Sequence, residues 1–397
     1  MPITQGHGFA RRLLARVPVL DDMPPLGPPL LLRFAMGRTV REPRRTVGIL
    51  VCMDAAQTYR ALVSRGDGVR PFVRVERLLE RDLPEHPVTV RVEASSLNYK
   101  DALAAAGRPG VMRRYPGTPG IDAAGVVTAS SDPRWSEGDA VIVTSFDLGM
   151  GTPGGLAERI RVPAEWPVAL PPGWDAVTAM GFGTAGLTAA LALERLEAVG
   201  LTPDAGPLAV TGAAGGVGSC AVALLAASGY HVVAVSGRAD AEAERLRSLG
   251  ATDVWTREQL AEGSDRPLRR ADLAGAIDAV GGAPLAQLLG RVARGGAVAT
   301  AGTVAGTRLS TTVFPFALRG VALLGVDSAE APSDVRARAW ARLAERGVAD
   351  ALRGSWHEVA LADVEPWLAD LLEGAVAGRV IVRMADGAAR DGARVGR

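Results

Sequence analysis

With 397 residues, the chain is longer than one hydrophobic core usually allows, so we expect at least two domains. Its net charge of +1 gives no field that would attract nucleic acid or an anionic membrane, and no apolar run approaches the length of a membrane span. The only cysteines, Cys52 and Cys220, exclude a disulfide framework and a four-cysteine zinc site, which favours a cytoplasmic location.

Residues 1–53 differ from the rest of the chain, because they are rich in arginine and proline and lack helical or strand periodicity. Proline interrupts their short leucine runs, which argues against a secretory signal. We expect a disordered or spurious leader with Met53 as the functional start, so that its removal leaves activity unchanged. A targeting arm is the alternative.

The following part alternates short apolar runs with turns, a pattern typical of a mostly β domain. Strands are predicted at residues 59–63, 87–92, 140–144 and 159–162, with a Gly-Asp-Gly turn at 66–68. A long helix over residues 183–197 would lead from this domain into the next.

Residues 211–218 read Thr-Gly-Ala-Ala-Gly-Gly-Val-Gly, between an apolar run and an alanine-rich helix, and a second apolar run follows at 231–235. This order predicts a β-α-β unit whose glycines let the backbone approach a pyrophosphate at the helix N-terminus. The alternative is a plain turn between two core elements. Four residues of the turn are expected to bind the cofactor: Ala214, Gly215, Gly216 and Val217.

The end of the second strand indicates which dinucleotide binds. An NAD site usually places an acidic residue there, whereas this chain has Ser236, Gly237 and Arg238. A hydroxyl and a guanidinium suit a 2′-phosphate, so these residues predict NADPH. Asp240 is the competing candidate and would favour NAD.

The remainder predicts a doubly wound parallel sheet, an α/β fold with helices between its strands. Further strands are expected near residues 275–279, 297–301 and 321–326, helices at 336–346 and 362–373, and a closing strand at 380–382 that returns to the first domain. Because the carboxyl ends of such strands line the ligand crevice, Gly302 is expected to contact the cofactor. Asp278 is expected to be either a solvated turn residue or a ligand contact.

Several segments resemble the zinc-independent branch of the medium-chain dehydrogenase/reductase family, and within it the acrylyl-CoA reductase group of quinone oxidoreductase-like proteins. They lie at residues 95–102, 119–125, 154–158, 183–186, 211–218, 235–238, 312–319 and 324–328. The resemblance extends over residues 59–383. It implies a GroES-like catalytic domain over 54–182 and 317–385 and a Rossmann NADPH-binding domain over 183–316. It also implies that Tyr99, Thr184 and Leu323 contact the cofactor. The tail over 386–397, rich in glycine, alanine and arginine, is expected to be disordered from its composition.

No metal ion is expected. Zinc relatives have a His-Glu pair where this chain has Ile121 and Asp122, and the four histidines lie outside every motif. The substrate must then be polarised and protonated by side chains or water.

The resemblance implies hydride transfer from NADPH to the β-carbon of a short 2-enoyl-CoA such as acrylyl-CoA. Tyr99 is the expected proton donor or anchor for the substrate. Lys100 would lower the pKa of Tyr99, orient the cofactor ribose or bind a phosphate. Asn98 would position the nicotinamide amide or the substrate, and Asp101 would orient Lys100. In the alternative, the segment is only a strand-to-helix turn with Asp101 in a cap and Tyr99 half-buried.

Two other functions remain open: NADPH-dependent reduction of a quinone or enone, and non-catalytic NADPH binding as a sensor. A homodimer is expected, because the apolar strand at 321–326 would form an uncovered sheet edge.

Overall fold

The computed structural model describes residues 57–66 and 72–384, which belong to one compact unit, Asp54–Arg397. The expectations for residues 1–53, for the tail at 386–397 and for most of the Gly-Asp-Gly turn lie outside the described residues.

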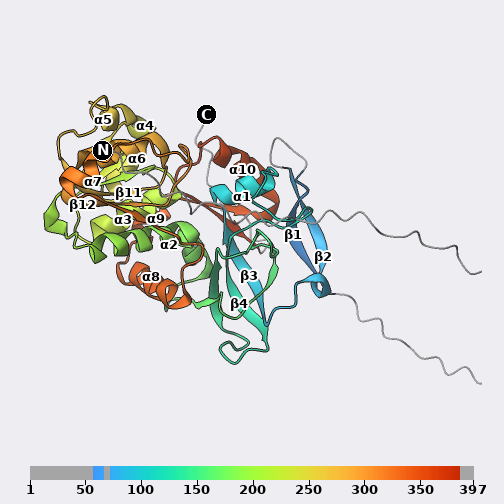
Figure 1. The fold of residues 1–397 in the computed structure, drawn as a ribbon. Helices are drawn as coiled ribbons and strands as arrows, with labels where there is room; N and C mark the ends of the chain where they lie inside the picture. Colours follow the sequence, from blue (N-terminus) through green and yellow to red (C-terminus); the bar gives the residue numbers. More distant parts are fainter. Residues whose placement is uncertain (1–56, 67–71, 385–397) are drawn as a thin grey trace, which may run out of the picture. The chain divides into compact units, whose positions relative to one another are not determined.

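Six parallel strands form one sheet in the order β10-β9-β8-β11-β12-β13. Every residue of β8, β9 and β11 is buried, as expected for a parallel sheet with helices on both faces (Figure 1). The strands are β8 (Leu208–Thr211), β9 (Val232–Val235), β10 (Asp253–Trp255), β11 (Leu273–Asp278), β12 (Val292–Thr300) and β13 (Ala322–Gly325). The helices that follow them along the chain are α3 (Gly216–Ala227), α4 (Ala239–Ser248), α5 (Arg257–Ala261), α6 (Gly282–Arg291), α7 (Phe314–Arg319), α8 (Ser333–Glu345) and α9 (Ala349–Arg353).

This sheet confirms the predicted β-α-β unit and the predicted edge position of the last strand. The expected domain boundary at residue 316 is wrong in one respect, because β13 lies beyond it and pairs in parallel with β12, Ala297 opposite Ala322. The strand expected at residues 321–326 is thus part of the parallel sheet, as predicted, and only the boundary was placed too early.

A second, seven-stranded sheet has the order β14-β15-β3-β4-β5-β7, with β6 paired to β3. Its strands are β3 (Val88–Ser96), β4 (Asp122–Ser130), β5 (Ala140–Thr144), β6 (Arg159–Val162), β7 (Val168–Ala169), β14 (Trp356–Ala360) and β15 (Arg379–Arg383). β15 pairs antiparallel with β3, Ile381 opposite Ser96, which confirms that the C-terminal strand returns to the first domain. A separate antiparallel pair, β1 (Thr58–Ser64) and β2 (Val73–Leu79), adds to the β-rich part.

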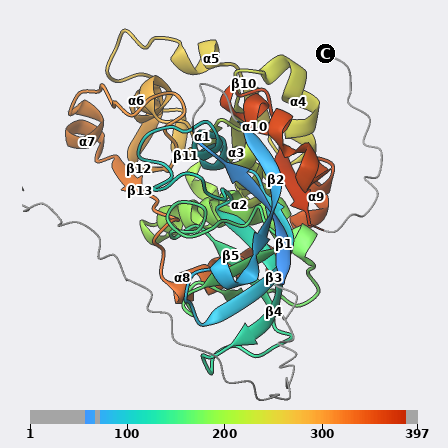
Figure 2. The same cartoon turned by 90° about the vertical axis from the view of Figure 1, so that its right-hand side faces the viewer.

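Two short helices accompany this sheet. α1 (Tyr99–Ala105) and α10 (Val364–Leu372) lie side by side in both views of the chain (Figures 1 and 2). Three 3₁₀ turns, η1 (Glu80–Asp82), η2 (Pro203–Ala205) and η3 (Leu361–Asp363), complete the described elements.

α2 (Ala176–Ala198) packs between the two sheets, contacting β3 and β4 of one and β11 and β12 of the other. It starts before the predicted helix, and its backbone breaks at Gly183, where φ is +51°. Its length and apolar composition would suit a membrane span, so the expectation that no such apolar segment exists is wrong. However, 89% of its most apolar window is buried inside the protein, the pattern of a core helix.

Candidate functional site

The glycine-rich turn follows β8 and leads directly into α3. Gly212 has a φ of +62°, a conformation that favours glycine. A Cβ at Gly218 would overlap the carbonyl oxygen of Gly212, so glycine is also needed for helix and strand to approach each other. The N-cap residue Gly215 offers no side-chain hydrogen bond, and the first N–H groups of the 12-residue helix therefore have no partner within it. This is the arrangement that an anionic phosphate group requires.

The turn is held in place by the residue before β15, by α4 and by α2. The carbonyl of Ala214 accepts hydrogen bonds from the backbone N–H of Gly378, at 2.9 Å, and from the guanidinium of Arg245, at 3.0 Å. A Cβ at Gly216 would lie 3.0 Å from Cδ of Arg379 and 3.5 Å from Cβ of Ala185. A side chain at Gly216 would thus be in tight contact with Arg379 and would have to displace it slightly, a constraint that the sequence did not reveal.

Asp278 is neither a solvated turn residue nor an open ligand contact, so both expectations for it are wrong. Its buried carboxylate accepts hydrogen bonds from the hydroxyls of Thr211, at 2.7 Å, and Thr300, at 2.8 Å, and from the N–H of Gly281, at 3.0 Å. It thus joins the carboxyl ends of β8, β11 and β12, where the ligand crevice of such a sheet is expected.

The end of β9 places Ser236, Gly237 and Arg238 together. Ser236 is buried, and its hydroxyl accepts the backbone N–H of Arg238 at 3.0 Å. The guanidinium of Arg238 donates to the carbonyls of Ala375 and Val376, at 2.6 and 2.8 Å, contacts that the sequence did not predict.

A second arginine lies at the same place. A Cβ at Gly237 would overlap the guanidinium of Arg257, the first residue of α5. Arg257 is exposed, and it lies 20 positions after Gly237 along the chain, so only the fold brings it to the strand end. Two arginines against the exposed Asp240 make this corner positively charged and suited to a 2′-phosphate.

The segment Asn98–Asp101 forms the start of α1. The side chains of Asn98 and Asp101 form hydrogen bonds with other described residues, whereas those of Tyr99 and Lys100 do not. Asp101 is buried, and its carboxylate accepts the backbone N–H groups of Asn98, at 2.8 Å, and Ile121, at 2.9 Å. It is thus a helix-capping residue, and the expectation that it orients Lys100 is wrong, since no ion pair between these two described residues exists. Burial, followed by the nearby negative charge of Asp122, raises the pKa of Asp101 from 3.8 to about 7.

Tyr99 and Lys100 point away from this buried network. Tyr99 is half-buried and Lys100 is exposed, and within the described part of the chain neither the phenol nor the ammonium has a hydrogen-bond partner. Both groups are consequently available to a ligand.

Asp122, the first residue of β4, is the centre of the site, although from the sequence it was expected only to replace a zinc ligand of related enzymes. Its fully buried carboxylate accepts hydrogen bonds from the hydroxyl of Ser96 (2.7 Å), the amide of Asn98 (2.8 Å), and both the N–H (3.0 Å) and the hydroxyl (2.5 Å) of Thr184. Arg379 lies 3.5 Å away as its counter-ion. An aspartate within an otherwise apolar strand, Ile-Asp-Ala-Ala, was the signal that could have identified it.

The directions of these hydrogen bonds decide what Thr184 can offer. Its only hydroxyl hydrogen is donated to Asp122, so the 2.8 Å contact with Ser145 requires the Ser145 hydroxyl to be the donor. Thr184 can therefore accept from a ligand but cannot donate to it. Asn98 is similarly committed, since its carbonyl accepts from Arg379 at 3.1 Å while its amide donates to Asp122.

Ser145 is positioned by a buried arginine that the sequence argument missed. The guanidinium of Arg336 donates to the carbonyls of Thr144, Ser328 and Ala329 and lies 4.0 Å from the ring centre of Phe146. Burial lowers the pKa of Arg336 from 12.5 to about 10. The arginine thereby fixes Thr144 and Phe146, the two neighbours of Ser145, against the segment that follows β13.

The remaining expected cofactor residues lie in the parallel sheet. Gly302 follows β12, and a Cβ there would overlap the backbone of Ala279. Val217 is half-buried in the first turn of α3. Leu323 lies in the middle of β13, opposite Val298, and packs against the hydrophobic cluster on that side of the sheet. Among residues 57–66 and 72–384, no group of three or more His, Cys, Asp or Glu side chains could hold a metal ion.

Comparisons with known proteins agree with this architecture. Residues 84–172 match the alcohol dehydrogenase GroES-like domain family, and residues 216–345 match the zinc-binding dehydrogenase family. The chain is 48% identical to the acrylyl-CoA reductase AcuI of Ruegeria pomeroyi, over 78% of this chain and 93% of that protein. It is 44% identical to the putative quinone oxidoreductase YhfP of Bacillus subtilis, over 82% of this chain and 99% of that protein.

Solved structures show the same fold. The yhdH oxidoreductase of Salmonella enterica, crystallised in complex with NADP, has a TM-score of 0.78 and 45% identity, covering 82% of this chain and all of that one. The structure of YhfP with NAD bound has a TM-score of 0.78 and 42% identity, covering 83% of this chain and all of that one. The chain therefore belongs to the medium-chain dehydrogenase/reductase family, in the zinc-independent, quinone oxidoreductase-like group that includes the acrylyl-CoA reductases.

Proposed function

We propose that the protein is an NADPH-dependent reductase of the carbon–carbon double bond of short 2-enoyl-CoA thioesters such as acrylyl-CoA. One observation carries the proposal: the buried carboxylate of Asp122 holds both Asn98, at the start of α1, and Thr184, at the break in α2. Its counter-ion Arg379 packs against the glycine turn, so that the catalytic segment and the nucleotide site are parts of one constellation.

The residues present fit NADPH. The free N–H groups at the start of α3 would hold the pyrophosphate, and Arg238 with Arg257 would hold the 2′-phosphate. The hydroxyl oxygen of Thr184 can only accept a further hydrogen bond, and the amide N–H of the nicotinamide would be a suitable donor to it. When bound, NADPH supplies the hydride.

The side chains that face a substrate are Tyr99 and Lys100. Negative charge develops on the thioester oxygen during reduction, and a donor aimed at that oxygen stabilises the transition state more than the ground state. The unpartnered phenol of Tyr99 can donate to this oxygen or to the α-carbon, and the exposed ammonium of Lys100 can bind a CoA phosphate. Asn98 and Asp101 act by fixing the backbone that carries these two residues.

Reduction of a quinone or enone by the same hydride is the second candidate. It is favoured by the similarity to YhfP, described as a putative quinone oxidoreductase. The two functions share the cofactor site and differ in the electron acceptor.

We also propose a cytoplasmic homodimer. Cys220 is a free, buried thiol, in agreement with a reducing compartment. β13 is an uncovered edge strand, and α7 just before it exposes Phe314 and Leu318, 44% and 52% accessible. Antiparallel pairing of β13 with its copy would place the copy's α7 beside the residues that follow β13.

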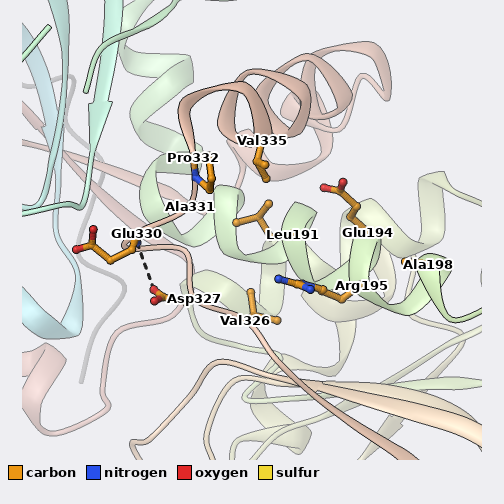
Figure 3. Close-up of a pocket in the computed structure, with 10 residues that line it drawn as sticks. All are labelled: Leu191, Glu194, Arg195, Ala198, Val326, Asp327, Glu330, Ala331, Pro332 and Val335. Atoms are coloured by element: carbon orange, nitrogen blue, oxygen red, sulfur yellow. Dashed lines mark hydrogen bonds between the residues drawn. The ribbon is translucent and has the colours of Figure 1, made fainter. Parts of the chain in front are cut away.

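A cavity lies at that position. It has a volume of about 400 Å³ and is bordered by Leu191 of α2, Val326 and Val335, with Arg195 and Glu330 among its charged lining (Figure 3). None of the expected catalytic or cofactor residues lines it. An apolar side chain from a second copy would fit its apolar part.

Turnover assays with purified protein test the proposed function. NADPH oxidation would be followed with acrylyl-CoA, an enone and a benzoquinone, and the thioester product identified by mass. Saturated acyl-CoA formation with NADPH preferred over NADH is expected. Quinone turnover with little thioester reduction would support the second candidate instead, and tight NADPH binding without oxidation by any acceptor would leave only the sensor function.

Tyr99→Phe tests the phenol. We expect turnover to fall about 100-fold, the usual contribution of a positioned proton donor, while NADPH affinity changes little. Tyr115→Phe is the matched control, because that hydroxyl donates to the Ala104 carbonyl at the opposite end of α1. Full activity of Tyr99→Phe would remove the phenol from the mechanism.

A further inference from the structure

Arg379, the first residue of β15, is a buried cation with an accessibility of 3%. Its guanidinium donates to the hydroxyl of Ser96 (2.7 Å), to the carbonyl of Leu97 (3.1 Å) and to the side-chain carbonyl of Asn98 (3.1 Å). One side chain thus fixes three consecutive residues at the junction of β3 and α1.

The same side chain also contacts the nucleotide-binding half. A Cβ at Gly216 would lie 3.0 Å from Cδ and 3.2 Å from Nη1 of Arg379. The preceding residue, Gly378, donates its backbone N–H to Ala214 in the glycine turn at 2.9 Å. The start of β15 therefore touches the turn on one side and the catalytic segment on the other.

Arg379 also reaches the break in α2. A Cβ at Gly183 would lie 2.6 Å from Nη2 of Arg379, and the next residue, Thr184, donates to Asp122, the counter-ion of Arg379. The orientation of Thr184 consequently depends on a carboxylate whose charge is balanced by Arg379.

We propose that Arg379 is a positioning residue that couples occupation of the glycine turn to the orientation of Asn98 and Thr184. This inference rests on the proposed function, because it assigns the turn to NADPH. Any displacement of the turn by the cofactor would press on the guanidinium, which is linked to Asn98 by one hydrogen bond and to Thr184 through Asp122. The planar guanidinium is needed, because a lysine ammonium cannot donate to three acceptors in this fork arrangement.

Two variants test this coupling: Arg379→Lys changes the cation itself, and Ser96→Ala removes the hydroxyl that links it to Asp122. Ser96 lies on β3, not in the turn, and its hydroxyl accepts from Arg379 and donates to Asp122. For each variant the NADPH dissociation constant would be measured by tryptophan fluorescence, alongside kcat and the melting temperature. Arg383→Lys is the matched control, because Arg383 lies on the same strand and its side chain forms an exposed ion pair with Glu358, its one polar partner within residues 57–66 and 72–384.

Loss of a hydrogen bond to a charged group typically changes an equilibrium about ten-fold or more, so we expect Arg379→Lys to weaken NADPH binding and to lower kcat by about that factor. Ser96→Ala should weaken NADPH binding in the same direction, and Arg383→Lys should match the wild type.

A lower melting temperature of Arg379→Lys with unchanged NADPH affinity and kcat would overturn the inference, since that is the result of a merely structural role. If Arg379→Lys does not fold, Ser96→Ala decides, and unchanged NADPH affinity in that variant is also contrary to coupling. Failure of the wild type itself to bind NADPH would instead remove the proposed function together with this inference.

Discussion

At the scale of single residues, buried carboxylates show how one side-chain type takes different roles. Asp278 receives only hydroxyl and N–H donors and joins strand ends, Asp122 has Arg379 as its counter-ion, and Asp101 has no cation of its own. Burial, followed by the nearby negative charge of Asp122, raises the pKa of Asp101 to about 7, so that this carboxyl holds its proton to near neutral pH.

This raised pKa predicts a pH dependence of stability. Between pH 4 and 7 the native protein keeps a proton on Asp101 that the unfolded chain has lost, so the free energy of unfolding decreases as the pH rises through this window. At 1.36 kcal/mol per pKa unit, the decrease amounts to roughly 4 kcal/mol. Asp101→Asn should flatten the dependence measured by urea denaturation, while Asp350→Asn, whose side chain is 93% exposed, should keep it. Equal slopes in all three proteins would show that Asp101 is ionised when folded.

The preference for NADPH over NADH is also expected to depend on single residues. Arg238→Ala and Arg257→Ala should each raise KM for NADPH about 10- to 100-fold with little effect on KM for NADH, because a hydrogen bond to a charged group contributes about 1.5–3 kcal/mol. Arg247→Ala, an exposed arginine in the last turn of α4, is the control. An equal increase of KM for both cofactors would indicate that this strand end binds NADH, with Asp240 on the ribose.

At the scale of elements, the strands and helices could be predicted far better than the side-chain partners. Periodicity predicted β5 and β6 with their observed bounds, because burial of alternating or continuous apolar residues is a local property. The contacts of Asp122 with Thr184 and of Arg238 with Ala375 could not be predicted. The partners lie 62 and 137 positions apart along the chain, respectively, and only the fold brings them together. Thr184 was assigned from resemblance alone, without the hydrogen bonds that fix it.

The break in α2 gives a prediction for an element. Gly183 has a φ of +51°, and a Cβ there would overlap the carboxylate of Asp122. Gly183→Ala should cost about 3 kcal/mol of stability and lower kcat, because both the backbone and the Asp122 cluster must shift. Denaturation and turnover of this variant would be compared with Gly354→Ala, whose added methyl group meets no atom within 4 Å. Wild-type stability of Gly183→Ala would mean that the helix does not break at this residue.

At the scale of the whole described unit, two sheets built from different segments are joined by the C-terminal strand. β15 pairs with β3 of the second sheet, while its first residues contact the glycine turn of the parallel sheet. The parallel sheet ends at β13, which remains unpaired on one side. In the proposed homodimer, the unpaired edge and the exposed apolar residues beside it would be covered by the same contact on both molecules.

The homodimer is therefore open to a direct test. If the copy's α7 covers the cavity beside Val326, then Leu318→Glu and Phe314→Glu place a charge against an apolar surface and should convert the dimer to monomer. Analytical ultracentrifugation at micromolar concentration would measure the change, with Val75→Glu as the control, since Val75 is an exposed apolar residue on β2. A monomeric wild type would remove the homodimer, and a dimer that persists in both α7 variants would place its interface elsewhere. Because none of the expected catalytic residues lines the cavity, the monomeric variants should keep NADPH-dependent turnover, which separates assembly from catalysis.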